Sequence, residues 1–155
     1  MTNEERIAIL EQKLKTLQVY YAAAMADATL RYGEAGVLAA VAERKRAEQL
    51  KAGAEMAKLY GISDPRQVFQ KVQETYGCAE WVMEGTESGF AATCTNCMLC
   101  AISKKKGVFS PCQINCLSPI EAMVRGLSPG AEFVVKKTLW NDDECAVIVN
   151  NLGTS

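Results

Sequence analysis

The sequence of 155 residues contains no histidine. Histidine is the side chain best suited to acid–base work at neutral pH and the commonest metal ligand. A catalytic dyad of the Cys–His type is therefore excluded. Any metal in this protein has to be held by thiolates, carboxylates, backbone groups or water.

The sequence also lacks an excess of charge and any long apolar run. Lys and Arg number 17 against 18 Asp and Glu, a net charge of −1, so no basic surface indicates nucleic acid. No apolar run approaches the ~20 residues of a membrane span. The start, MTNEERIAILEQ, is acidic and polar, unlike a signal peptide. We expect a cytoplasmic protein without nucleic-acid or membrane partners, in which thiols stay reduced.

The composition is that of an ordinary globular chain, with 49% apolar and 23% charged residues. The length predicts one domain, residues 1–155. Within it, residues 1–76 have helical patterns and residues 77–155 combine strands with cysteines. We expect the first part to serve packing or dimerisation.

Three helices are predicted in residues 1–76. The first starts at an Asn3 cap and ends at Gly33. The second covers residues 34–60, with Gly61 at its C-terminal cap. The third follows Ser63-Asp64-Pro65 and ends near Gly77.

Apolar residues in the first helix recur with a strict three–four spacing, which is typical of a coiled-coil seam. The seam consists of Ile7, Leu10, Leu14, Leu17, Tyr21, Ala24 and Ala28. Two interpretations remain open: a face buried within the same chain, or a helix that pairs in a homodimer.

From Cys78 onward the pattern predicts an antiparallel sheet. Residues 78–85 and 88–94 form a first hairpin, and residues 132–140 and 144–151 a second. Between them, Lys104–Gly107 is expected as an exposed turn. Ser118-Pro119-Ile120-Glu121 is a capping signature that predicts a helix over Ser118–Leu127. The fold class is therefore α+β, with about three N-terminal helices, a small antiparallel sheet, a cysteine-rich loop and one further helix.

Five of the seven cysteines lie within 23 residues, with spacing C-x2-C-x2-C followed by C-x3-C. We interpret this cluster as a metal or cofactor site. Three thiolates from one short segment, with a fourth from elsewhere, suit an iron–sulfur cluster, and four also suit tetrahedral zinc. The candidate ligands are Cys94, Cys97, Cys100, Cys112 and Cys116, where either of the last two completes the set.

Other roles for the cysteines stay open. The C-x2-C spacing also suits dithiol exchange, and free cysteines are common core residues. Cys78 is assigned to packing, while Cys145 belongs either to packing or to the site. Lys104, Lys105 and Lys106 lower nearby thiol pKa values or form a solvated turn.

The C-terminal half resembles the 4-vinyl reductase domain and its relative, the L-2-amino-thiazoline-4-carboxylic acid hydrolase family. The resemblance rests on Cys94, Cys112, Cys116, the helix Ser118–Leu127, and the segment Asp142-Asp143-Glu144-Cys145-Ala146-Val147-Ile148-Val149. It implies an α+β domain that binds small ligands, is often dimeric through N-terminal helices, and in some members holds a metal through cysteines. The chain departs from the pattern at Lys137-Thr138, where a cysteine is usual.

These observations favour a small cytoplasmic metal–thiolate protein that binds a small molecule or acts in redox chemistry or sensing. A first alternative is a hydrolase of a small cyclic C–N substrate, with a metal-activated water or a cysteine nucleophile. Its base would be a carboxylate such as Glu84, Glu87 or Glu121. A second alternative is a structural zinc module in a dimeric adaptor. The sequence does not decide whether the chain is an enzyme.

Overall fold

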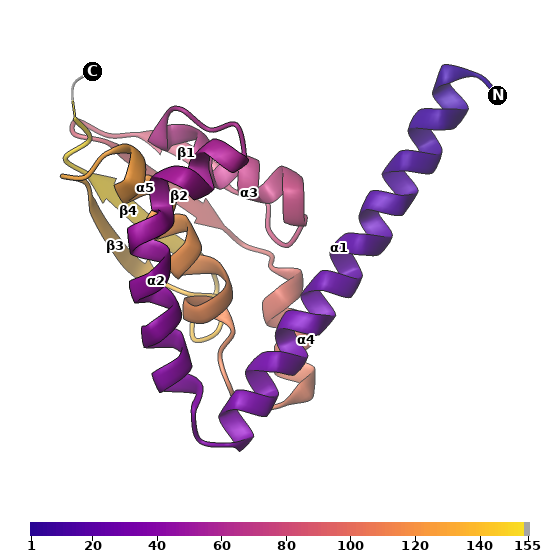
Figure 1. Ribbon diagram of the computed structural model, residues 1–155, viewed down its shortest axis with the longest axis horizontal. Coiled ribbons are helices and arrows are strands. Elements are labelled where there is room, and N and C mark those ends of the chain that lie inside the picture. Colours follow the sequence, from indigo (N-terminus) through magenta and orange to yellow (C-terminus); the bar gives the residue numbers. More distant parts are fainter. Residues whose placement is uncertain (154–155) are drawn as a thin grey trace.

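The computed structural model describes residues 1–153 and has the predicted α+β class (Figure 1). None of the helices described is long and apolar enough to cross a membrane. The elements in chain order are α1 (Asn3–Glu34), α2 (Leu38–Leu59), the 3₁₀ turn η1 (Pro65–Gln67), α3 (Val68–Tyr76), β1 (Val82–Gly85), β2 (Phe90–Cys94), α4 (Met98–Lys106), the π-helical turn η2 (Cys112–Leu117), α5 (Ser118–Leu127), β3 (Glu132–Lys137) and β4 (Cys145–Asn150).

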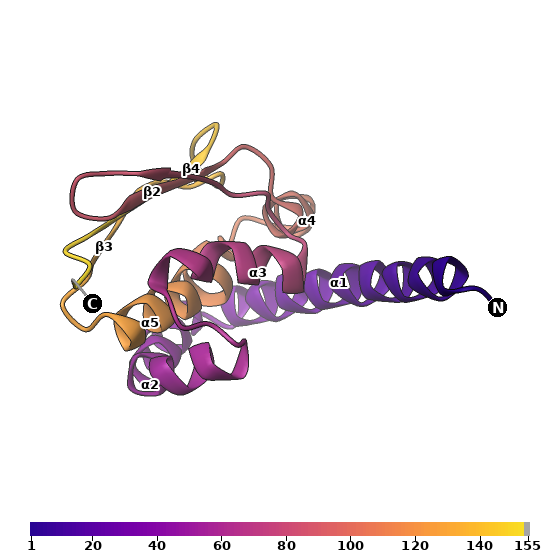
Figure 2. The same ribbon diagram turned by 90° about the horizontal axis from the view of Figure 1, so that it is seen from above.

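The four strands form one antiparallel sheet in the order β1-β2-β4-β3. Both predicted hairpins are confirmed, and β2 and β4 join them at the centre. Alternate residues of β2 and β4 are buried, as expected of a sheet with one covered face. Figure 2 shows the helices gathered on that face, with α3 and α5 beneath the strands.

The core lies between this sheet face and the helices. Phe69 of α3 is fully buried, and its ring packs against those of Trp81, Phe90 and Phe133. The apolar side of α5 adds three more fully or almost fully buried side chains, those of Ile120, Met123 and Val124. These side chains make α5 the central helix of the core.

Helix α5 approaches α2 so closely that both helices need glycine at the contact. A Cβ on Gly53 of α2 would overlap the backbone carbonyl of Ala122. A Cβ on Gly126 of α5 would overlap the backbone nitrogen of Ala54. The two helix backbones are therefore in direct contact.

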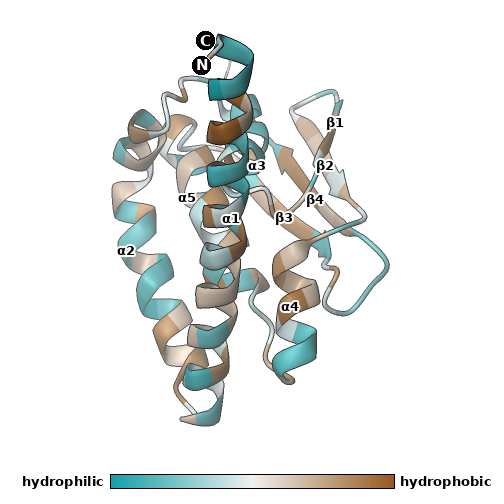
Figure 3. Ribbon diagram, turned by 90° about the vertical axis from the view of Figure 1, so that its right-hand side faces the viewer, coloured by the Kyte–Doolittle hydropathy of each residue, from teal (hydrophilic) through white to brown (hydrophobic). Residues whose placement is uncertain are grey.

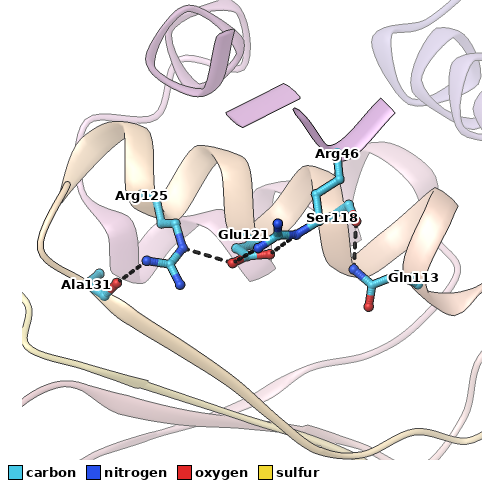
Figure 4. Close-up of polar contacts among 6 residues, drawn as sticks. All are labelled: Arg46, Gln113, Ser118, Glu121, Arg125 and Ala131. Carbon is cyan, nitrogen blue, oxygen red and sulfur yellow. Dashed lines mark hydrogen bonds and ion pairs between the residues drawn. The ribbon is translucent and has the colours of Figure 1, made fainter. Parts of the chain in front are cut away.

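An ion-pair network around a buried carboxylate also joins these two helices (Figure 4). The carboxylate of Glu121 is 7% exposed and accepts two hydrogen bonds from Arg46, at 3.1 and 2.9 Å, and one from Arg125 at 2.9 Å. Arg125 also donates to the Ala131 carbonyl at 2.8 Å. Two cations thus compensate the buried carboxylate, as a buried charge requires.

The predicted bounds of α5 are confirmed, but the predicted cap is wrong. The chain enters α5 from η2 without a break, and Ser118 accepts a hydrogen bond from the Gln113 side chain at 2.7 Å. Pro119 cannot donate to the carbonyl four residues earlier, and its ring crowds that carbonyl. The wider π turn before Pro119 relieves this conflict.

Two further local predictions are corrected. The cap of α1 is Thr2 rather than Asn3, because Thr2 and Glu5 form a reciprocal capping box. Lys104, Lys105 and Lys106 are the last turn of α4 rather than a turn outside a helix. Cations there face the negative end of the helix dipole, which favours the helical state.

We predict that Gly53→Ala lowers the free energy of unfolding by about 1–3 kcal/mol, the usual cost of overpacking. Helix propensity alone predicts the opposite sign, since Ala is favoured over Gly by about 1 kcal/mol within a helix. Urea unfolding measures the difference. Gly130→Ala is the control, because no atom lies within 4 Å of a Cβ added there. A Gly53→Ala protein of unchanged or higher stability would contradict the close α2–α5 contact.

Candidate functional site

All seven cysteines of the chain line a single cavity beside the sheet. Its volume is about 170 Å³. They come from five segments: the link before β1, strands β2 and β4, the start of α4, and η2. The wall also contains Met25, Met56, Trp81 and three tyrosines, Tyr21, Tyr60 and Tyr76. Among residues 1–153, no charged side chain contributes to the lining.

The sheet supplies Cys94 and Cys145. They end β2 and begin β4 and are directly paired across the two strands. Their neighbours at spacing two, such as Ala92 and Val147, are buried under the helices. The same alternation turns both thiols toward the helices, where the cavity lies.

The start of α4 supplies Cys97 and Cys100. Cys97 is the N-cap residue, and its sulfur accepts the Cys100 backbone N–H at 3.5 Å. Cys78 is brought beside it by a short antiparallel contact: Ala79 pairs with Cys97, and the Met98 N–H donates to the Cys78 carbonyl at 2.7 Å.

The π turn η2 supplies Cys112 and Cys116. It carries Cys112 to a sulfur–sulfur distance of 3.3 Å from Cys100. Cys116 follows four residues later and lines the same cavity. The π turn that precedes Pro119 is therefore also the segment that presents two of the thiols.

Three thiols are shifted toward the thiolate form by donors that point at their sulfurs. The Cys100 thiol lowers the pKa of Cys97 to about 6, with help from the backbone N–H groups of Cys100 and Leu99. It also lowers the pKa of Cys112 to about 7, with help from Ser110 and the Trp140 N–H. The Cys94 thiol lowers the pKa of Cys145, which also accepts the Leu139 N–H at 3.2 Å.

The other four thiols are held protonated. The pKa of Cys100 is raised because its hydrogen serves Cys112 and Cys97, and that of Cys94 because it donates to Cys145. Burial raises the pKa of Cys116 well above its ordinary value. Burial and the neighbouring Cys97 charge raise that of Cys78 to about 11. Some cysteines of the cavity thus act as hydrogen-bond donors and others as acceptors.

The three tyrosines form a connected wall. The rings of Tyr21 and Tyr76 stack with centroids 5.0 Å apart, and the hydroxyls of Tyr60 and Tyr76 are hydrogen-bonded. Burial, with the Tyr60 hydrogen bond next, raises the pKa of Tyr76 to about 12. These residues lie far from the cysteine motif in sequence, and only Tyr21 carried a signal, as a member of the α1 seam.

The structure brings together all five cysteines predicted from spacing and adds Cys78 and Cys145 to the same wall. For Cys78 this differs from the packing role assigned from sequence. The carboxylates considered as hydrolytic bases lie elsewhere. Glu84 and Glu87 are exposed on β1 and the turn after it, and Glu121 is bound to Arg46 and Arg125.

The donor set fits a thiophilic metal group. Thiolate is the soft ligand that iron–sulfur clusters and zinc take, and three thiols are already shifted toward that form. As the side chains stand, no group of three or more Cys, Asp or Glu in the described part of the chain is arranged to hold one metal ion. Holding a single ion would therefore require thiol side chains to turn inward.

Comparisons with protein-family models, with curated proteins and with solved structures found no match to this chain. The resemblance drawn from residues 94–149 stays a prediction.

We predict that Cys97 in the reduced, metal-free protein reacts with iodoacetamide at a rate that rises around pH 6. Cys78 is similarly half-buried but should become reactive only near pH 11. The reason is that the thiolate is the reacting form. Rates at each site can be followed by peptide mass spectrometry over a pH series.

The variant Cys100→Ala serves as the test of cause. It removes the thiol donor from Cys97 but keeps the backbone donors, so the midpoint for Cys97 should move upward by part of the shift. A wild-type midpoint near the ordinary value of 9.0 would contradict the arrangement of donors described here.

Proposed function

We propose that this chain binds an iron–sulfur cluster in the thiol-lined cavity and acts in redox chemistry or sensing. The observation that carries the proposal is the convergence of seven cysteines from five segments on one cavity of about 170 Å³. The candidate ligands remain Cys94, Cys97, Cys100 and either Cys112 or Cys116. Cys78 and Cys145 are available as further thiols on the same wall.

The size of the cavity favours a compact group. It is close to the ~150 Å³ of an engineered cavity that holds benzene, and below the ~300–1,000 Å³ typical of sites for drug-sized molecules. A cluster takes one thiolate at each of several iron atoms. Sulfurs spread around a cavity suit that demand better than they suit one zinc ion, which draws four ligands to a single point.

The hydrogen bonds around the sulfurs are also favourable for a redox role. Backbone N–H groups of Cys100, Leu139 and Trp140 point to the sulfurs of Cys97, Cys145 and Cys112 respectively. Hydrogen bonds to the sulfurs and exclusion of solvent are among the factors that set a cluster's potential. They also stabilise negative charge in a cavity whose described lining contains no cation.

Zinc is the alternative occupant, in a structural role. Purification without oxygen, followed by iron, zinc and sulfide analysis, separates the two. A brown protein with iron and acid-labile sulfide supports the proposal. A colourless protein with stoichiometric zinc would overturn it in favour of the zinc module. A protein with neither, even after anaerobic reconstitution with iron and sulfide, would overturn both.

We predict that Cys97→Ser loses most of the bound metal while the helices stay folded. A serine hydroxyl remains protonated where a thiolate would bind, and Cys97 is only partly buried at the edge of the core around Phe69 and α5. Metal per chain and far-ultraviolet circular dichroism measure the two effects.

The matched control is Ser103→Ala in the same helix, α4. Ser103 is buried with no hydrogen-bond partner for its hydroxyl among the residues described, so its loss should change neither metal content nor helicity. Full metal retention in Cys97→Ser would remove Cys97 from the ligand set. Loss of helicity in that variant would show that the site is needed for folding, contrary to this proposal.

A further inference from the structure

The N-terminal half of α1 projects from the rest of the molecule (Figures 1 and 2), and its apolar seam is exposed. From Met1 to Tyr21 no residue is buried and only Gln18 is partly so. Apolar and polar segments alternate along this helix in Figure 3. The exposed fractions of the seam residues are 54% for Ile7, 63% for Leu10, 47% for Leu14, 66% for Leu17 and 47% for Tyr21.

Apart from Tyr21, whose ring stacks on Tyr76, the seam is not the face that α1 buries within its own chain. The side chains buried against the body belong to Ala22, Ala26 and Thr29, which lie about a quarter to two-fifths of a turn around the helix from the seam. The last seam residues, Ala24 and Ala28, are exposed and half-buried respectively. The seam therefore stays open along almost its whole length.

A helix segment in this situation needs a partner. Isolated helices shorter than about 12–15 residues are marginal in water, and most helix stability comes from packing of an apolar face. The last tie to the body before the free end is Gln18, whose amide donates to the carbonyls of Glu74 and Thr75 at 3.3 and 3.1 Å. The apolar seam extends eleven residues beyond that tie, to Ile7.

We propose that a second copy of this chain packs along the seam as a parallel, in-register coiled coil. In the heptad, Ile7, Leu14 and Tyr21 occupy the a positions, and Leu10 and Leu17 the d positions. Arg6 then falls at g and Glu11 at the following e. In the parallel pair, Arg6 of each copy lies opposite Glu11 of the other, so the flanking charges are complementary between identical chains.

The seam also reaches the thiol cavity, through Tyr21. This residue occupies an a position, stacks on Tyr76 and lines the cavity. In the parallel dimer it packs against Tyr21 of the second copy. The partner helix therefore covers the outer side of the tyrosine wall and restricts access to the cavity.

The first test compares Leu10→Asp with Ile9→Asp by sedimentation velocity across the micromolar range. Both residues are exposed and apolar, at 63% and 43%, and adjacent in sequence, but only Leu10 lies on the seam. Leu10→Asp removes two buried leucines from each dimer and should weaken dimerisation at least ~100-fold. Ile9→Asp should dimerise like the wild type.

A monomeric wild type at tens of micromolar would overturn the proposal and leave the seam to a partner of another sequence. So would equal behaviour of the two variants. The parallel register is tested by charge: Arg6→Glu should weaken the dimer several-fold at low salt, and adding Glu11→Arg should restore it. Failure of the double variant to restore dimerisation would overturn the register.

Closure of the cavity is tested on reduced, metal-free protein, so the result does not depend on the cluster. At a concentration where the wild type is dimeric, the cavity thiols of Leu10→Asp should react faster with a maleimide. Dilution of the wild type below its dissociation constant should raise its rate to the same value. A rate independent of association would overturn the closure while leaving the dimer intact.

Discussion

The contact between the sulfurs of Cys100 and Cys112 is the interaction on which the site depends. These atoms are 3.3 Å apart and belong to α4 and η2, which are separated by the segment 107–111. The described lining contains no charged group, so a buried thiol there has few hydrogen-bond acceptors for its S–H group. The Cys100 thiol stays protonated and hydrogen-bonds to neighbouring sulfurs. These hydrogen bonds stabilise negative charge on Cys97 and Cys112. The Cys94–Cys145 pair repeats the same solution at the end of the sheet.

This arrangement lets seven thiols share one small cavity. Were all of them ionised, the charge would be intolerable in a low-dielectric site. Three cysteine sulfurs act as hydrogen-bond acceptors and the other four thiols stay protonated. Two of the protonated thiols, Cys94 and Cys100, donate to the acceptors, which limits the negative charge in the cavity. Metal binding would replace hydrogens with cations at the same sulfurs, so the protein changes its charge balance rather than its framework.

Much of the fold could be predicted from the sequence, because its local signals agree with the tertiary structure. Gly61 and Gly77 take left-handed φ values of 70° and 62° and end their helices as expected. The capping prediction at Ser118 failed because η2 already supplies the preceding helical turn, which a proline–glutamate signature does not reveal. The five clustered cysteines could be read from their spacing. Cys78 and Cys145 joined them only through pairing of distant segments, Ala79 with Cys97 and Cys94 with Cys145, which no local pattern records.

The backbone contact that holds α2 against α5 involves no residue of the cavity wall. The backbone contact of Gly53 with α5 and the Glu121 network lie outside the cavity wall, whereas the aromatic cluster around Phe69 reaches that wall through Trp81. The thiols sit where the ends of β2 and β4 meet α4 and η2, and two of them, Cys100 and Cys112, are part of the core itself. The three tyrosines connect the cavity to three helices, because Tyr60 follows α2, Tyr76 ends α3 and Tyr21 lies on α1. Through Tyr21 the cavity wall is continuous with the apolar seam of α1.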